Sequence, residues 1–93
     1  MPENAPPPLA LSDWRFCRWH KQTRFYEAVL QQDLWGQWLL TRRWGRRDNR
    51  GTRGGQEKVI PCDSYEEGQR QLEATIARRA QRGYVLVSAG DEK

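Results

Sequence analysis

The sequence is short of cysteine and of long hydrophobic runs, and each shortage excludes a class of protein. Cys17 and Cys62 are the only cysteines among 93 residues, too few for the dense disulfide framework of small secreted domains. No apolar run reaches the length of about 20 residues that a transmembrane helix needs. The first residues also lack the basic and apolar parts of a secretory signal. We therefore expect a single cytoplasmic domain, without membrane contact, that is stabilised mainly by side-chain packing.

Residue types used in catalysis and metal binding are also scarce. His20 is the only histidine, and no nucleophile and base pair, paired-carboxylate motif or cofactor fingerprint accompanies it. Cys17 and His20 form a Cys-x-x-His pair, but the spacing of Cys62 and Asp63 does not complete a zinc signature. The glycines of residues 51–55 do not match a nucleotide-binding P-loop. The sequence thus predicts no catalytic residues, no metal site and no cofactor.

Arginine, by contrast, is concentrated in one segment. The chain carries 16 Lys and Arg against 12 Asp and Glu, a net charge of +4. Residues 42–53 alone sum to +5, so the rest of the chain sums to −1. The arginines of this segment are Arg42, Arg43, Arg46, Arg47, Arg50 and Arg53. Because guanidinium groups make bidentate contacts with phosphate, this density favours a phosphate-binding surface over a solvated loop that only keeps the protein soluble.

The periodicity of the sequence predicts the order of its elements. Strands are indicated at 14–19, 24–31, 38–44, 56–61 and 84–87. Ser64 and Glu67 form a capping box at the start of a helix, and Gly83 follows its end. This order predicts an α+β fold, in which a twisted antiparallel β-sheet carries one α-helix packed on a face. The predicted segments are a disordered proline-rich stretch at 1–12, the domain at 13–88 and a C-terminal tail at 89–93.

Finer expectations concern faces and packing. The strand at 38–44 places Trp38, Leu40, Arg42 and Trp44 on one face, and Leu39, Thr41 and Arg43 on the other. Residues 45–55 are predicted to form a long polar loop. Pro61 cannot donate to a strand ladder, so its strand ends there or lies at an edge of the sheet. The tryptophans expected in the core are Trp14, Trp19, Trp35 and Trp38, and the last strand is expected to cover that core.

The tripeptide Trp44-Gly45-Arg46 and the landmarks around it resemble the WGR domain family. The landmarks are Arg24-Phe25-Tyr26-Glu27, Trp38, Thr52-Arg53-Gly54-Gly55-Gln56, the Ser64-x-x-Glu67 helix start and Arg82-Gly83-Tyr84. They extend roughly from Trp14 to Val87, and as an ordered set they are much more specific than the tripeptide alone. WGR domains are found in DNA-dependent poly(ADP-ribose) polymerases and in small bacterial proteins.

The resemblance implies a role for the motif. In the polymerases its Trp and Arg contact DNA near the 5′ end of a strand break, and the domain couples DNA binding to neighbouring domains. Carried over, Trp44 would lie against a terminal sugar or base, and Arg46 would contact backbone phosphate or a neighbouring domain. The predicted nucleic-acid site comprises Trp44, Gly45, Arg46, Arg42, Arg43, Arg47, Arg50 and Arg53. The chain departs from the family where Arg47-Asp48-Asn49-Arg50 precede Gly51, which lengthens the loop and adds charge.

The expected function is a non-enzymatic module that binds the DNA backbone at strand ends or nicks, without reading base sequence. In a bacterium such a protein would be associated with the nucleoid. RNA and single-stranded DNA stay open as ligands, because phosphate contacts and stacking serve either. The alternative hypothesis is a protein-interaction module whose same surface binds an acidic partner or a separate DNA-processing enzyme.

Overall fold

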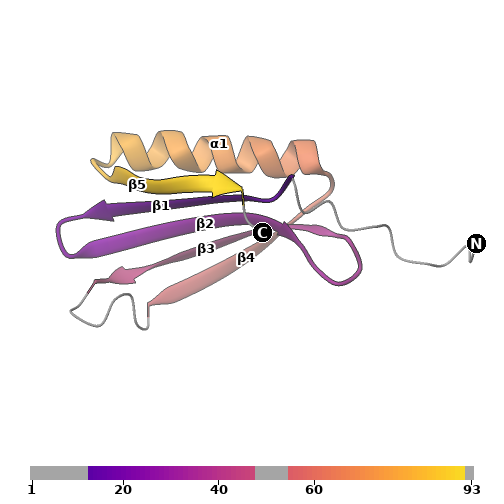
Figure 1. The fold of residues 1–93 in the computed structure, drawn as a ribbon, viewed down its shortest axis with the longest axis horizontal. Coiled ribbons are helices and arrows are strands. Elements are labelled where there is room, and N and C mark those ends of the chain that lie inside the picture. Colours follow the sequence, from indigo (N-terminus) through magenta and orange to yellow (C-terminus); the bar gives the residue numbers. More distant parts are fainter. Residues whose placement is uncertain (1–12, 48–54, 92–93) are drawn as a thin grey trace, which may run out of the picture.

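Five antiparallel strands and one helix make up the computed structural model, which describes residues 13–47 and 55–91. The elements are β1 (Arg15–Lys21), β2 (Arg24–Gln32), β3 (Trp38–Arg46), β4 (Gln56–Cys62), α1 (Tyr65–Gln81) and β5 (Val85–Asp91). The strand order is β4-β3-β2-β1-β5, and α1 runs along one face of this open sheet (Figure 1). The predicted α+β fold is therefore confirmed. Within the described residues no helix is long and apolar enough to cross a membrane.

The β2–β3 hairpin forms the centre of the sheet. Its register pairs Gln32 with Trp38 at the turn and Arg24 with Arg46 at the far end. β3 thus continues two residues past the predicted strand end, because Gly45 and Arg46 still have partners on β2. The predicted loop therefore begins later than residue 45, and most of it lies outside the described residues. β4 forms an edge of the sheet, which is one of the two alternatives that Pro61 predicted, and it continues to Cys62 instead of ending at Pro61.

The helix begins and ends where the sequence predicted. The Ser64 hydroxyl accepts a hydrogen bond from the Glu67 backbone N–H at 3.1 Å, which caps the first turn. At the other end Gly83 adopts φ +83°, a left-handed conformation that glycine tolerates best. Gly68 faces Leu30, and the absence of a side chain at this position lets the helix approach β2 closely. α1 packs mainly on β2, β3 and β4.

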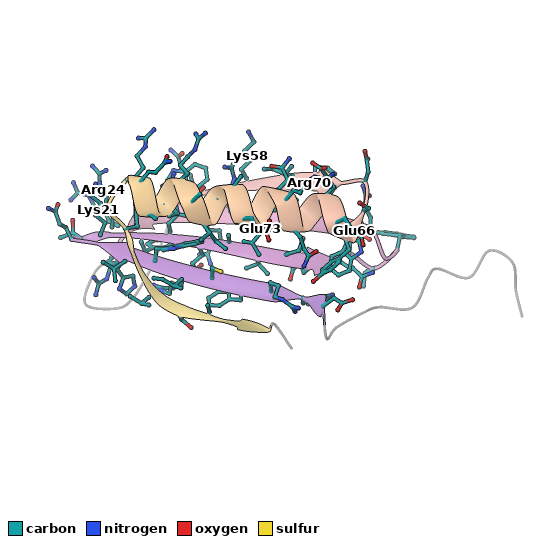
Figure 2. All side chains as sticks on the ribbon, turned by 90° about the horizontal axis from the view of Figure 1, so that it is seen from above. Lys21, Arg24, Lys58, Glu66, Arg70 and Glu73 are labelled. Atoms are coloured by element: carbon teal, nitrogen blue, oxygen red, sulfur yellow. The ribbon has the colours of Figure 1, made fainter. Side chains whose placement is uncertain are left out.

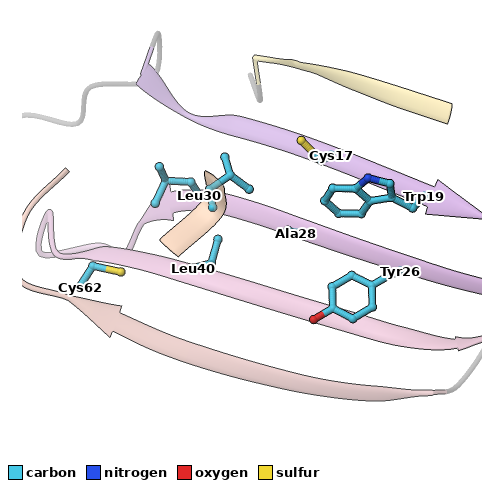
Figure 3. Packing of buried hydrophobic residues seen from close by; sticks show 8 residues of the cluster. Cys17, Trp19, Tyr26, Ala28, Leu30, Leu40 and Cys62 are labelled. Atoms are coloured by element: carbon cyan, nitrogen blue, oxygen red, sulfur yellow. The ribbon is translucent and has the colours of Figure 1, made fainter. Parts of the chain in front are cut away.

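The two faces of the sheet differ in composition. The face toward α1 carries Cys17, Trp19, Tyr26, Ala28, Leu30, Leu40 and Cys62, which form the buried core together with Leu72 of α1 (Figure 3). The opposite face carries a row of charges in which Glu27 accepts hydrogen bonds from Arg18 and Arg43. Arg43 also lies 3.8 Å from a Glu57 carboxylate oxygen. The predicted division of β3 between two faces is confirmed by this arrangement.

Three expectations, two about packing and one about the end of the last strand, are wrong. Trp35 is 72% exposed, because it lies in the turn between β2 and β3 rather than in a strand. The last strand does not cover the core: it forms the edge beyond β1, and Val85 is 64% exposed. The same strand continues to Asp91 instead of ending at Val87, because residues up to Asp91 pair with β1. The expected tail from Ala89 is therefore largely strand.

Candidate nucleic-acid interface

Trp44 is half-buried near the end of β3, on the face that α1 covers in part. Its cross-strand partner is Tyr26 on β2, and the two rings are stacked at 5.8 Å between centroids with 14° between planes. Tyr26 in turn meets the ring of Tyr84 edge-on at 6.1 Å. Trp44 therefore contributes to the packing of the core and to an aromatic surface at this end of the sheet.

Arg79 enters this aromatic cluster from the last turn of α1. Its guanidinium carbon lies 4.1 Å from the centroid of the Tyr26 ring and 5.1 Å from that of Tyr84. Cation–π contacts of this kind fix the direction of the guanidinium while leaving its N–H groups free to find acceptors. The helix thus delivers a positioned positive charge to the end of the sheet where the Trp-Gly-Arg motif lies.

Two of the nitrogen atoms at this site have no acceptor. Among the described residues, the buried side-chain polar atoms that lack a hydrogen-bond partner are Nε of Arg42 and Nε of Arg79. Both arginines line one hollow together with Tyr26. A buried donor without an acceptor costs about 1–3 kcal/mol. Because both Nε atoms are closed to solvent, a ligand would contact the terminal nitrogens of these two guanidinium groups instead.

Two adjoining hollows give this surface its shape. The larger, about 480 Å³, is lined by Tyr26, Arg42, Trp44, Lys58, Arg79 and Tyr84. The smaller, about 220 Å³, is lined by Arg24, Phe25, Trp44, Gly45, Arg46 and Tyr84. Trp44 and Tyr84 line both, so an aromatic wall separates two basic hollows. None of the described residues that line either hollow is a carboxylate, and the surface is therefore suited to a polyanion.

The motif glycine is required by a close approach of two backbones. An added Cβ at Gly45 would lie 2.8 Å from the Cα of Gly55 and 3.1 Å from Cε1 of Phe25. Gly55 itself has φ +88°, and a Cβ there would lie 2.3 Å from the carbonyl oxygen of Trp44. The two glycines thus hold the chain after the loop tightly against the motif.

The arrangement agrees with a comparison against known protein families. The family model described as WGR domain matches residues 15–91, nearly the whole chain. The chain belongs to the WGR domain family. WGR domains are binding modules known for nucleic-acid binding. No curated protein and no solved structure matches the sequence.

The other predicted residues of this WGR domain are distributed over both faces. Arg46 and Arg47 are exposed at the end of β3, and the Arg47 guanidinium donates to the Gln22 carbonyl at 3.1 Å. Arg43 lies on the helix-free face, where Glu27 accepts its hydrogen bond at 3.1 Å. It is thus separated by the sheet from Arg42 and Trp44. Arg50 and Arg53 lie outside the described residues.

The WGR surface also includes residues that sequence reasoning did not assign to the site. These are Arg24, Tyr26, Lys58, Arg79 and Tyr84. Tyr26 and Tyr84 were visible as family landmarks. Arg79 lies in the last turn of α1, where its charge also complements the helix dipole. The sequence separation of Arg79 and Trp44 does not indicate that they are close in space, because only the crossing of α1 over the sheet brings the two residues together.

The cysteines and the histidine lie apart from this interface. Burial raises the pKa of both thiols, Cys17 and Cys62, so they stay protonated at neutral pH. His20 lies on the helix-free face and accepts a hydrogen bond from Arg18 at 3.1 Å. Burial, and then the charges of Arg47 and Arg18, lower its pKa. In the described part of the chain, no three His, Cys, Asp or Glu side chains are placed to hold a metal ion.

Proposed function

We propose that this WGR domain binds the DNA backbone at strand ends or nicks, without catalysing a reaction, through the aromatic wall and the two basic hollows. The observation that carries the proposal is the larger hollow, in which Arg42, Lys58 and Arg79 lie around aromatic rings and no lining residue is a carboxylate. A phosphate oxygen is the acceptor that a guanidinium binds most strongly. Backbone phosphate between these two arginines would also place the sugar chain beside Trp44.

The aromatic wall supports the preference for ends. Inside an intact duplex each base is covered on both sides, whereas a strand end or nick leaves the last base or sugar uncovered. Trp44 and Tyr84 separate the hollows and can cover such an exposed face. Arg46 then lies in the second hollow, one residue beyond the motif glycine, where it can contact the next phosphate. None of these groups is arranged to read base edges in a groove, so binding is expected to be independent of sequence.

A competition experiment with closed and open DNA tests the proposal. The probe is a labelled short duplex, and the competitors are dumbbells of the same sequence, closed by hairpin loops at both ends, with or without a single nick. We expect the nicked dumbbell to compete strongly and the closed dumbbell weakly. Equal competition by both would contradict the end preference, and absence of binding even at low salt would contradict nucleic-acid binding by the domain.

Matched arginine variants test the assignment of the site. We expect Arg42→Gln and Arg79→Gln each to weaken binding and to reduce the slope of log affinity against log salt by about 1. Arg43→Gln is the control on the same strand but the opposite face, and Arg70→Gln is the control on the same helix, where the arginine pairs with Glu67. Neither control should change the salt slope. If Arg43→Gln weakened binding as much as Arg42→Gln, the ligand would lie on the wrong face for this proposal.

A further inference from the structure

The turn between β2 and β3, residues 33–37, presents two large apolar side chains to solvent. Leu34 is 81% exposed and Trp35 is 72% exposed. Isolated exposed apolar residues are common on protein surfaces. Here the two are adjacent in sequence, lie at the tip of a hairpin and include a tryptophan, the residue type most often found at the energetic centre of protein interfaces.

This 33–37 turn is held rigidly by hydrogen bonds. The Asp33 carboxylate accepts from the backbone N–H of Trp35 at 2.9 Å and of Gln37 at 3.0 Å. Backbone bonds join Asp33 to Gln37 and to Gly36, and Gly36 takes the positive φ that the turn requires. The Gln32 amide donates to the Gly36 carbonyl at 3.0 Å. A rigid apolar tip loses little conformational entropy on binding, and this lowers the cost of forming a complex.

The charge around the turn identifies the class of ligand. Asp33 belongs to the turn, Asp63 follows the β4 residue that pairs with Trp38, and Glu66 lies in the first turn of α1. Figure 2 shows Glu66 at the end of the helix opposite to Lys21 and Arg24. Arg15 and Arg70 also lie toward this end, and Arg70 pairs with Glu67. The carboxylates outnumber these arginines and repel phosphate, so this end of the molecule is less suited to nucleic acid than the aromatic wall. A protein surface with basic side chains would instead be attracted to it.

We infer that the 33–37 turn is a docking site for a protein partner that offers an apolar pocket with a basic rim, into which Trp35 and Leu34 insert. The turn joins β2 and β3 at one end of the sheet, opposite to the turn between β1 and β2 (Figure 1), and the Tyr26–Trp44 pair of the aromatic wall lies toward that other end. Trp44 lies six residue steps after Trp38, a distance of roughly 20 Å along β3. Nucleic acid and the partner can therefore be bound together, and the domain would connect the two. The connection rests on the proposed function, whereas the docking of the partner on the turn does not.

Site-specific crosslinking in source cells tests the inference. A photoreactive phenylalanine analogue replaces Trp35 in one variant of the full chain and Leu86 in the control, where an apolar residue of β5 is 49% exposed. We expect a nuclease-resistant protein adduct at position 35 and none at position 86. The adduct protein is identified by mass spectrometry, purified and titrated against the unmodified chain. Absence of an adduct specific to position 35 overturns the inference, as does an adduct only with nucleic acid or with a second copy of this chain.

The titration separates the contributions of the turn. Trp35→Ser should weaken binding of the purified partner by about 30-fold or more, whereas Leu86→Ser should leave it unchanged. Asp33→Ala removes the acceptor that holds the turn and should also weaken binding, while Asp33→Asn keeps an acceptor oxygen and should reduce mainly the salt dependence. Thermal denaturation of each variant establishes that it is folded. Equal affinity of the wild type and Trp35→Ser for the partner would overturn the inference.

Discussion

Replacing the motif glycine by alanine should destabilise the fold by a predictable amount. At Gly45 the new methyl group would lie 2.8 Å from the Cα of Gly55, a backbone atom that cannot rotate away. Inserting a methyl group into such a contact costs about 1–3 kcal/mol. Gly55→Ala should cost more, because its methyl group would lie 2.3 Å from the Trp44 carbonyl oxygen and its φ of +88° adds about 1–2 kcal/mol of left-handed strain. We therefore expect about 1–3 kcal/mol for Gly45→Ala and about 2–5 kcal/mol for Gly55→Ala.

Gly90 supplies the matched control. It lies in β5, has no heavy atom within 4 Å of an added Cβ and does not have a positive φ. Gly90→Ala should therefore be neutral or stabilise the protein by up to about 1 kcal/mol, through the reduced entropy of the unfolded chain. Urea denaturation gives the free energies, and melting temperatures should fall by about 4–8 °C per kcal/mol in a domain of this size. Wild-type stability of Gly45→Ala, or equal destabilisation by Gly90→Ala, would refute the close-approach explanation.

Three further predictions concern buried polar groups, the helix cap and the thiols. Glu27→Gln should lower the free energy of unfolding by about 1.5–3 kcal/mol in urea, since Glu27 is 8% exposed and accepts charged hydrogen bonds; an unchanged midpoint would contradict this. Ser64→Ala should cost about 1 kcal/mol by loss of the cap, measured by circular dichroism during urea denaturation, and full stability would argue against the cap. Because burial raises the pKa of Cys17 and Cys62 above their ordinary 9.0, their contribution to stability is present below pH 9 and lost as pH rises further. The loss of stability above pH 9 should be smaller in Cys17→Ala than in the wild type, and identical pH profiles of the two proteins would contradict this prediction.

Local sequence signals predicted the elements well because the physical causes are local. The capping box at Ser64 and Gly83 at the helix end act within one turn, and the alternation along β3 assigns each side chain to a face. The packing of Trp35 was mispredicted, since its size suggested burial while the acceptor geometry of Asp33 made it part of a turn. Aromatic content thus indicated that a core exists without indicating which aromatic residues form it.

The interface was predictable only in part, because some of its residues come from α1 and from the segment that follows it. Trp44, Arg42 and Arg46 could be located by motif and charge, whereas Arg79 and Tyr84 join them only through the crossing of the helix over the sheet. That crossing depends on packing such as the contact of Gly68 with Leu30. Long-range contacts of this kind leave no periodic trace in the sequence.

The position of each arginine along β3, rather than the total charge of the segment, decides which arginines can bind a ligand. Arg42 lies on the α1 side beside Trp44, and its Nε has no acceptor. Arg43, one residue later, is turned to the other face and is already occupied by Glu27 and Glu57. A strand shift of one residue would exchange the two roles. The charge of +5 in residues 42–53 therefore overstates how much positive charge β3 itself offers to nucleic acid. Arg79 of α1, which lies outside this segment, adds a positive charge to the same surface.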